Sequence, residues 1–243
     1  MMINKRYLGA FFCATMLFFS DLASAQSQVE TSHELTTLYR AARKVISVNQ
    51  KHINDASIAG KGLSAASVKE KTLENYLEAS GKALDMASLS KAQQAMISAV
   101  EDVMAENQEL INEQGVGFKG FLPAIFARQV ATKFSSKMAG QMKIKLTAPK
   151  NYVRNRSNRP DKWEHNVIER MFKKEGYEKG KAFSEEASVL GKNAFRFILP
   201  EYYGKSCLGC HGKPKGEKDI TGGKKEGGVL GELGGAISLT IFQ

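Results

Sequence analysis

The sequence has little cysteine and no long hydrophobic run. Its 243 residues include three cysteines, at positions 13, 207 and 210. The longest apolar stretch, residues 7–19, is too short to span a bilayer comfortably. No internal repeat is present. With 42% hydrophobic and 25% charged residues, the composition is that of a globular protein. A disordered, collagenous or multi-span membrane chain is therefore excluded.

Residues 1–25 read as a secretory signal peptide. Lys5 and Arg6 precede the apolar run, and Ala23-Ser24-Ala25 supplies the small residues of a cleavage site. We expect cleavage after Ala25, export to the periplasm and no stable membrane span in the mature chain. Retention of the segment as an anchor is the alternative. Cleavage would remove Cys13, so Cys207 and Cys210 would be the cysteines of the mature protein.

The charge balance is basic, with 35 Lys and Arg against 25 Asp and Glu and a net charge of +10. An exported basic protein suits an acidic redox or signalling partner, or an anionic membrane surface. Basic side chains beside an aromatic residue can bind single-stranded nucleic acid, and this sequence places Arg154, Arg156 and Arg159 near Trp163. We favour two other roles for these arginines: ion pairs with the carboxylates of a cofactor, or a turn that places the tryptophan in the core. We expect no binding of nucleic acid.

The pentapeptide Cys207-Leu208-Gly209-Cys210-His211 has the pattern of c-type haem attachment. Two thiols at this spacing can each add across one vinyl group of the same porphyrin, and the next imidazole becomes the proximal iron ligand. The pattern predicts one covalently attached haem c, with Cys207 and Cys210 as thioethers and His211 on the iron.

Three other interpretations of this pentapeptide stay open. A thioredoxin-like dithiol needs a strand before it and a helix from the first cysteine, whereas glycine-rich sequence follows here. A closed zinc site needs four ligands, and the mature chain adds only His33, His52 and His165. A disulfide would close a tiny loop that restrains little of the unfolded chain, and it leaves His211 unexplained.

Helical periodicity dominates the first half of the chain. We expect helices over residues 32–55, 67–81, 90–114 and 121–138, and one more over 161–174. Ser67 with Glu70 and Asp161 with Glu164 fit capping boxes at two of these starts. Pro123 suits the first turn of the fourth helix, because its missing N–H costs nothing there.

Alternating apolar residues predict strands over 143–147, 195–199 and 236–241, with the Cys-x-x-Cys-His segment between the last two. Residues 212–235 are rich in glycine and lysine and predict a flexible loop, which either folds over a haem edge or simply connects two strands. The fold class expected is α+β: a single domain, residues 26–243, with a helical part (32–138) and a sheet and haem part (140–243).

Several segments together resemble a known family: periplasmic or extracytoplasmic c-type haem domains with a PAS-like fold, found alone and as the sensing part of histidine kinases and chemoreceptors. The matching pieces are Val45-Ile46 through Ile53-Asn54-Asp55, Gly117-Phe118-Lys119-Gly120-Phe121-Leu122-Pro123, Val153-Arg154-Asn155 with Asn158-Arg159-Pro160-Asp161-Lys162-Trp163-Glu164, and Glu201-Tyr202-Tyr203 through Cys207-Leu208-Gly209-Cys210-His211-Gly212. The resemblance implies a small antiparallel PAS-like sheet that cradles one haem, with long helices packed on it.

Some members of that family carry a cysteine on the helix before the first strand as sixth iron ligand. The corresponding position here lies near residues 126–128, where no cysteine stands. Candidate sixth ligands are His33, His52, His165, Met86, Met96, Met104, Met138, Met142 and Met171. We expect either His52 or an open distal site. Arg128 and Arg154 are candidates for propionate pairing or for the distal pocket.

These features favour a periplasmic c-type haem-binding protein that senses or binds a redox state or a diatomic gas and has no catalytic activity of its own. The alternative is a soluble monohaem electron-transfer cytochrome. A haem peroxidase would need a distal acid and base, and nothing in the spacing directs His52 or His165 to the iron.

Overall fold

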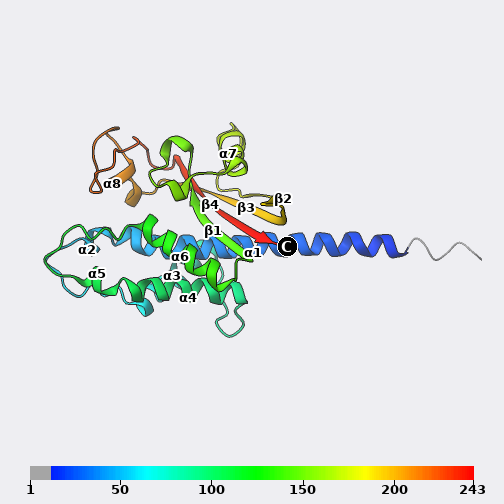
Figure 1. The fold of residues 1–243 in the computed structure, drawn as a ribbon, viewed down its shortest axis with the longest axis horizontal. Helices are drawn as coiled ribbons and strands as arrows, with labels where there is room; N and C mark the ends of the chain where they lie inside the picture. The colour runs from blue at the N-terminus through cyan, green and yellow to red at the C-terminus, as the bar shows by residue number, and fades with distance from the viewer. Residues whose placement is uncertain (1–11) are drawn as a thin grey trace, which may run out of the picture.

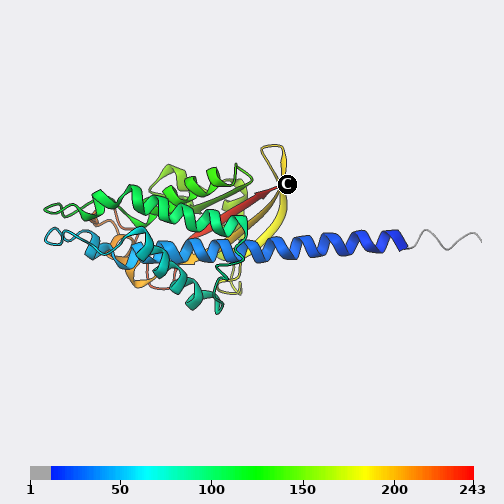
Figure 2. The same cartoon turned by 90° about the horizontal axis from the view of Figure 1, so that it is seen from below.

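The longest element is a single helix, α1 (Phe12–Val48), in a computed structural model that describes residues 12–243, with side chains from Ser27 onward. This helix runs along the whole molecule, and its N-terminal part extends beyond the rest of the fold (Figures 1 and 2). It continues through Ala25, the expected cleavage point, while residues 1–11 of the expected signal peptide lie outside the described residues. None of the helices described has the length and apolar character needed to cross a membrane.

Five further helices follow α1 and pack along it. They are α2 (Gln50–Ile53), α3 (Ala65–Ser80), α4 (Lys91–Glu106), α5 (Gln108–Asn112) and α6 (Pro123–Lys137). The apolar stripes that predicted them are buried together, with Leu35, Ile46 and Met96 among the fully buried side chains. Pro123 stands in the first turn of α6, as expected.

The helix expected over residues 32–55 already begins at Phe12 and is interrupted between α1 and α2. Two further helix boundaries differ from the sequence prediction. α3 begins earlier than Ser67, because Ser64 is its N-cap and accepts a hydrogen bond from the backbone N–H of Ser67 at 3.1 Å. The helix expected over residues 90–114 is divided at Asn107, whose side-chain amide donates to the Val103 carbonyl at 2.7 Å. An asparagine that bonds to the preceding turn competes with the backbone ladder, which explains the break.

The second half of the chain forms one antiparallel sheet. Its strands are β1 (Met142–Thr147), β2 (Phe183–Val189), β3 (Lys192–Tyr202) and β4 (Leu233–Phe242), in the order β1-β4-β3-β2. Three of them match the predicted strands. β2 was not predicted, because its Ser and Glu residues give an edge strand with little apolar alternation. Leu190 and Gly191, both with positive φ, form the tight turn into β3.

The sheet packs on the helices with one face and carries a smaller core on the other. Phe195, Phe197 and Leu239 join the helical core below the sheet, and Ile198 and Ala236 form a second cluster above it. That second cluster is closed by α7 (Lys162–Val167) and the π-helical turn η3 (Ile168–Phe172), which replace the helix expected over 161–174. The fold is α+β, as predicted, with long helices against a small antiparallel sheet (Figure 1).

Short turns complete the chain and carry the predicted site. The 3₁₀ turns η1 (Lys150–Tyr152) and η2 (Arg156–Asn158) lie between β1 and α7. Between β3 and β4, the 3₁₀ turn η4 (Lys205–Cys207) runs directly into the single-turn helix α8 (Leu208–His211). The Cys-x-x-Cys-His segment therefore occupies one tight turn near the ends of two sheet strands.

Candidate functional site

The two cysteines lie on one short helical turn. Cys207 ends η4 and Cys210 lies within α8, so their three-residue spacing brings both side chains to the same side of the turn. Both thiols are free and partly exposed. Burial raises the pKa of the Cys210 thiol, so this group stays protonated at neutral pH. The turn thus carries two thiols on one side.

Helix α1 anchors this turn from below. Ser206, next to Cys207, shares a hydrogen bond with Ser47 of α1, with 2.8 Å between the two hydroxyl oxygens. At the end of β3, Glu201 binds both Arg40 and Arg43 of α1. A mostly buried carboxylate held by two guanidinium groups is a rigid connection. The position of the cysteines is therefore fixed relative to the longest helix.

The His211 ring is held on two sides. Its Nδ1 lies 2.8 Å from a carboxylate oxygen of Glu226, and its plane stacks on Tyr203 with 5.4 Å between ring centroids. Burial acts to raise the pKa of Glu226, but hydrogen bonds from Arg154 and His211 outweigh it and keep that pKa below its usual value. An ionised Glu226 accepts a hydrogen bond from Nδ1–H, which leaves Nε2 as the ring atom available to a metal.

Arg154 connects the elements of the site. Its guanidinium donates to the Cys210 carbonyl at 2.6 Å and to the Lys224 carbonyl at 3.0 Å, and it pairs with Glu226 and Asp219. Both carboxylates are nearly or fully buried, so these contacts are poorly screened by water. Arg154 therefore locks the glycine-rich segment onto the cysteine turn.

Within that segment, which connects β3 to β4, residues 216–225 form a small hairpin. Gly216 N–H donates to the Lys225 carbonyl at 2.9 Å, and Lys225 N–H donates to the Glu217 carbonyl at 2.8 Å. Two glycines of the segment are required by close packing: a side-chain carbon at Gly228 or Gly234 would clash with the Tyr203 ring. The glycines allow the backbone to enclose the aromatic ring that supports His211.

Comparison with known proteins gives a single result. A family model described as Tll0287-like matches residues 23–241. The chain belongs to the Tll0287-like family. This is a family of periplasmic c-type haem-binding proteins with a PAS-like fold, and the chain is accordingly a haem-binding, c-type-cytochrome-like domain. Neither a curated protein nor a solved structure matches the chain significantly.

The residues of this Tll0287-like chain fit a haem. Two accessible thiols share one face of a turn, and the adjacent imidazole has one nitrogen held by a carboxylate and the other available to iron. Metal-bound histidines usually donate their second N–H in this way. Within residues 12–243, no group of three or more His, Cys, Asp or Glu side chains is arranged to hold a metal ion by itself.

Other predicted site residues lie elsewhere in the fold. Arg128 is exposed on α6 and lines a groove beside β1 whose described lining includes no residue of the cysteine turn. His52 Nε2 lies 2.8 Å from the Lys61 carbonyl, and His33 packs edge-on against Phe197 with 4.7 Å between ring centroids. His165 lies on α7, and its buried Nδ1 has no hydrogen-bond partner among the described residues.

The candidate methionine ligands divide between the cores and the surface. Met96, Met104 and Met138 are buried in the helical core, and Met142 packs against it. Met171 packs against the second cluster, and Met86 is half exposed.

Sequence reasoning missed the second layer of this Tll0287-like site. Glu226, Asp219 and Tyr203 hold His211 and Arg154, yet they lie 8 to 15 residues from His211 in segments with no regular periodicity. The available signal was the presence of four acidic residues, Glu217, Asp219, Glu226 and Glu232, in a lysine-rich loop.

Proposed function

We propose that this protein carries one haem c, attached through Cys207 and Cys210, with His211 Nε2 as proximal iron ligand. In the attachment, each S–H adds across a vinyl C=C bond: sulfur bonds to one carbon, the proton goes to the other, and no oxidant is needed. The bound haem would supply one-electron redox chemistry and an iron site for diatomic gases. Support comes from the single turn that carries both thiols and an imidazole already oriented by Glu226.

The chain's own residues have distinct parts in this proposal. Glu226 accepts a hydrogen bond from Nδ1–H and so sets the tautomer and orientation of the His211 ring. Tyr203 restrains the ring by stacking, and Arg154 holds Glu226 in place. Covalent attachment keeps the cofactor bound in the dilute periplasm, where the family resides.

We further propose that the protein senses or binds a redox state or a diatomic gas and has no catalytic activity of its own. The supporting observation concerns the distal ligand. His52 Nε2 already has the Lys61 carbonyl as a partner, 2.8 Å away, and the His33 ring packs edge-on against Phe197, so neither ring is held free for an iron. An iron without a sixth ligand from the chain is open to small ligands.

A soluble monohaem electron carrier is the second candidate. The His211 side chain is 33% exposed, which favours a haem edge near the surface and electron exchange with a docked protein. The net charge of +10 suits an acidic redox partner. A carrier would have a saturated, low-spin iron that does not bind external ligands.

Optical spectra of the holoprotein, ferric and ferrous, with and without carbon monoxide, test these proposals. A sensing or binding module should show a carbon monoxide-dependent shift of the ferrous Soret band. An unchanged low-spin spectrum would contradict the sensing or binding proposal and favour the electron carrier.

His211→Ala should abolish the wild-type spectrum while haem stays covalently bound, and His165→Ala is the matched control. Oxidation of a dye by hydrogen peroxide in the presence of the wild-type protein, lost in His52→Ala, would contradict the proposal that the protein has no catalytic activity.

A further inference from the structure

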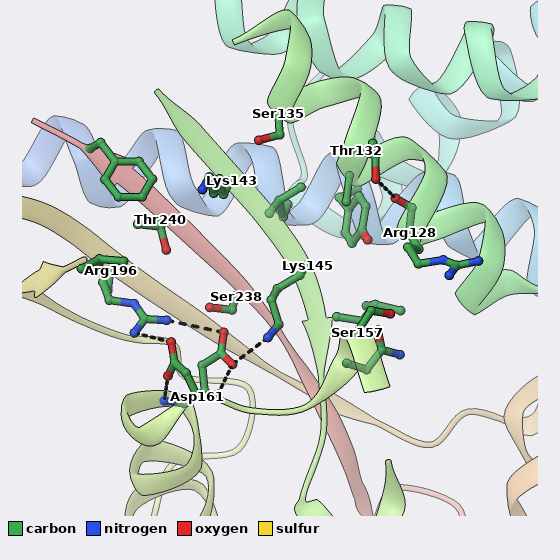
Figure 3. A pocket seen from close by; sticks show the side chains of 18 of the residues that line it. Arg128, Thr132, Ser135, Lys143, Lys145, Ser157, Asp161, Arg196, Ser238 and Thr240 are labelled. Atoms are coloured by element: carbon green, nitrogen blue, oxygen red, sulfur yellow. Dashed lines mark hydrogen bonds and ion pairs between the residues drawn. The ribbon is translucent and has the colours of Figure 1, made fainter. Parts of the chain in front are cut away.

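A groove with a volume of about 590 Å³ follows β1, and none of the residues that line it belongs to the cysteine turn or contacts His211. In Figure 3, β1 runs between Arg128, Thr132 and Ser135 of α6 on one side and the row of Arg196, Ser238 and Thr240 on the other. The groove is therefore distinct from the proposed haem site.

β1 is an edge strand, and no other strand of the described chain pairs with its main chain on the side away from β4. Phe242 N–H donates to the Gln141 carbonyl at 2.9 Å, which fixes the alternation of hydrogen bonds between the two strands. In an antiparallel pair, each residue directs both of its main-chain groups to the same side. Lys143 and Lys145 therefore bond to β4, and Met142, Ile144 and Leu146 point to the free edge.

The contacts on the free edge agree with this alternation. The Ser135 hydroxyl donates to the Met142 carbonyl at 3.2 Å, as expected if that carbonyl points away from β4. Within residues 12–243, no protein group bonds to the N–H or C=O of Ile144 and Leu146 on this edge. Ile144 and Leu146 both line the groove, and Leu146 is partly exposed. Unpaired edge groups of this kind are a template for another strand.

The charges that line the groove indicate which kind of peptide could pair with β1. The groove is lined by four cationic and two acidic side chains, and both acids are already engaged. Asp161 pairs with Arg196 at 2.8 Å, and Glu164 pairs with Lys145 at 3.1 Å. Among the described residues, Arg128 has no carboxylate partner. The Lys143 ammonium has none either, and its Nζ lies 5.3 Å from the centroid of the Phe242 ring. Two positive charges are left for a ligand.

We propose that this groove binds an extended acidic peptide segment of a partner protein, which adds to the sheet along β1. Main-chain hydrogen bonds to Ile144 and Leu146 give affinity, and carboxylates of the peptide meet Arg128 and Lys143. Leu146, Val189 and Phe242 offer apolar contacts to the intervening side chains. The site lies apart from His211, so the partner would be held without covering the haem ligands.

The test uses the full holoprotein and a fluorescent peptide of about six residues, the length of β1, in which glutamate and valine alternate. Fluorescence anisotropy at low ionic strength should show saturable binding. Arg128→Ala and Lys143→Ala should each weaken it about two- to fivefold, since both charges lie at the surface. Lys82→Ala, an exposed lysine on the loop after α3, should leave binding unchanged.

Two peptide controls separate strand addition from simple charge attraction. N-methylation of alternate amides, made in both possible sets, should weaken binding at least about tenfold for one set, because it removes main-chain donors. A lysine and valine peptide should not bind. Equal binding of all N-methylated peptides, or full displacement by glutarate as a small dicarboxylate, would overturn the proposal. So would the absence of saturable binding.

Discussion

Glu226 is the residue with the greatest expected influence on the proposed haem iron without touching it. Its carboxylate lies 2.8 Å from His211 Nδ1, and Arg154 pairs with the same carboxylate. A charged acceptor makes the imidazole a more basic ligand, which stabilises ferric over ferrous iron. The sequence pattern identified His211 but not this partner, because a contact across a hairpin leaves no periodic signal.

Glu226→Gln should raise the reduction potential of the holoprotein, since the neutral amide keeps a hydrogen-bond acceptor but removes the negative charge. Spectroelectrochemical titration measures the change. Glu232→Gln is the matched control, because Glu232 binds Tyr152 and the Val229 N–H but not His211. A lowered potential, or the same shift in both variants, would contradict the assigned contact.

Asp219, in the hairpin, is expected to make the stability of the fold depend on pH in the acid range. Burial, the largest influence, acts to raise its pKa, but hydrogen bonds from Thr221 and Arg154 outweigh it and lower the pKa to about 2 from an ordinary 3.8. A carboxyl with a depressed pKa stabilises the fold above about pH 4, and that stability is lost as the pH falls through about 2.

Asp219→Asn should therefore melt at a lower temperature than wild type at pH 7, and the gap should narrow between about pH 4 and pH 2. Thermal unfolding followed by circular dichroism at a series of pH values measures it. A gap that stays constant down to pH 2 would show that Asp219 does not contribute through its charge.

At the scale of elements, the apolar stripes predicted where helices and strands run better than where they end. The Asp161 and Glu164 capping box marked the start of α7 correctly, since both of its hydrogen bonds are local in sequence. α3 was assigned the wrong cap, because Ser64 and Ser67 both precede apolar residues. β2 carries too few apolar side chains for its alternation to predict a strand, and only pairing with β3 defines it.

Ser64→Ala should lower the free energy of unfolding by about 1 kcal/mol, because the N-cap hydroxyl satisfies a backbone N–H of the first turn. Ser67→Ala should have almost no effect, or stabilise slightly, since alanine is the better helix former. Urea unfolding of both variants measures the difference. A larger loss in Ser67→Ala would support the cap predicted from sequence.

For the whole molecule, one core joins the helices to the sheet. Phe197 of β3 is 1% exposed and shares its cluster with α1, α4 and α6. Arg40 and Arg43 also tie α1 to Glu201 at the end of β3. We therefore expect the cysteine turn and the helices to unfold together.

Phe197→Ala should cost about 3 to 5 kcal/mol through lost burial and the cavity left behind. Urea unfolding followed by helical circular dichroism and by haem absorbance should give coincident transitions, both shifted. Leu190→Ala is the control, because Leu190 is 91% exposed. Two separate transitions would contradict a shared core.

Covalent attachment through Cys207 and Cys210 is the central claim, and the intact mass of the denatured protein tests it most directly. The protein would be exported from cells that contain a c-type cytochrome maturation system. We predict one haem retained by the wild-type chain, and none retained by the Cys207→Ser, Cys210→Ser double variant. A wild-type mass without haem, or haem that is fully removed by denaturation, would contradict the account.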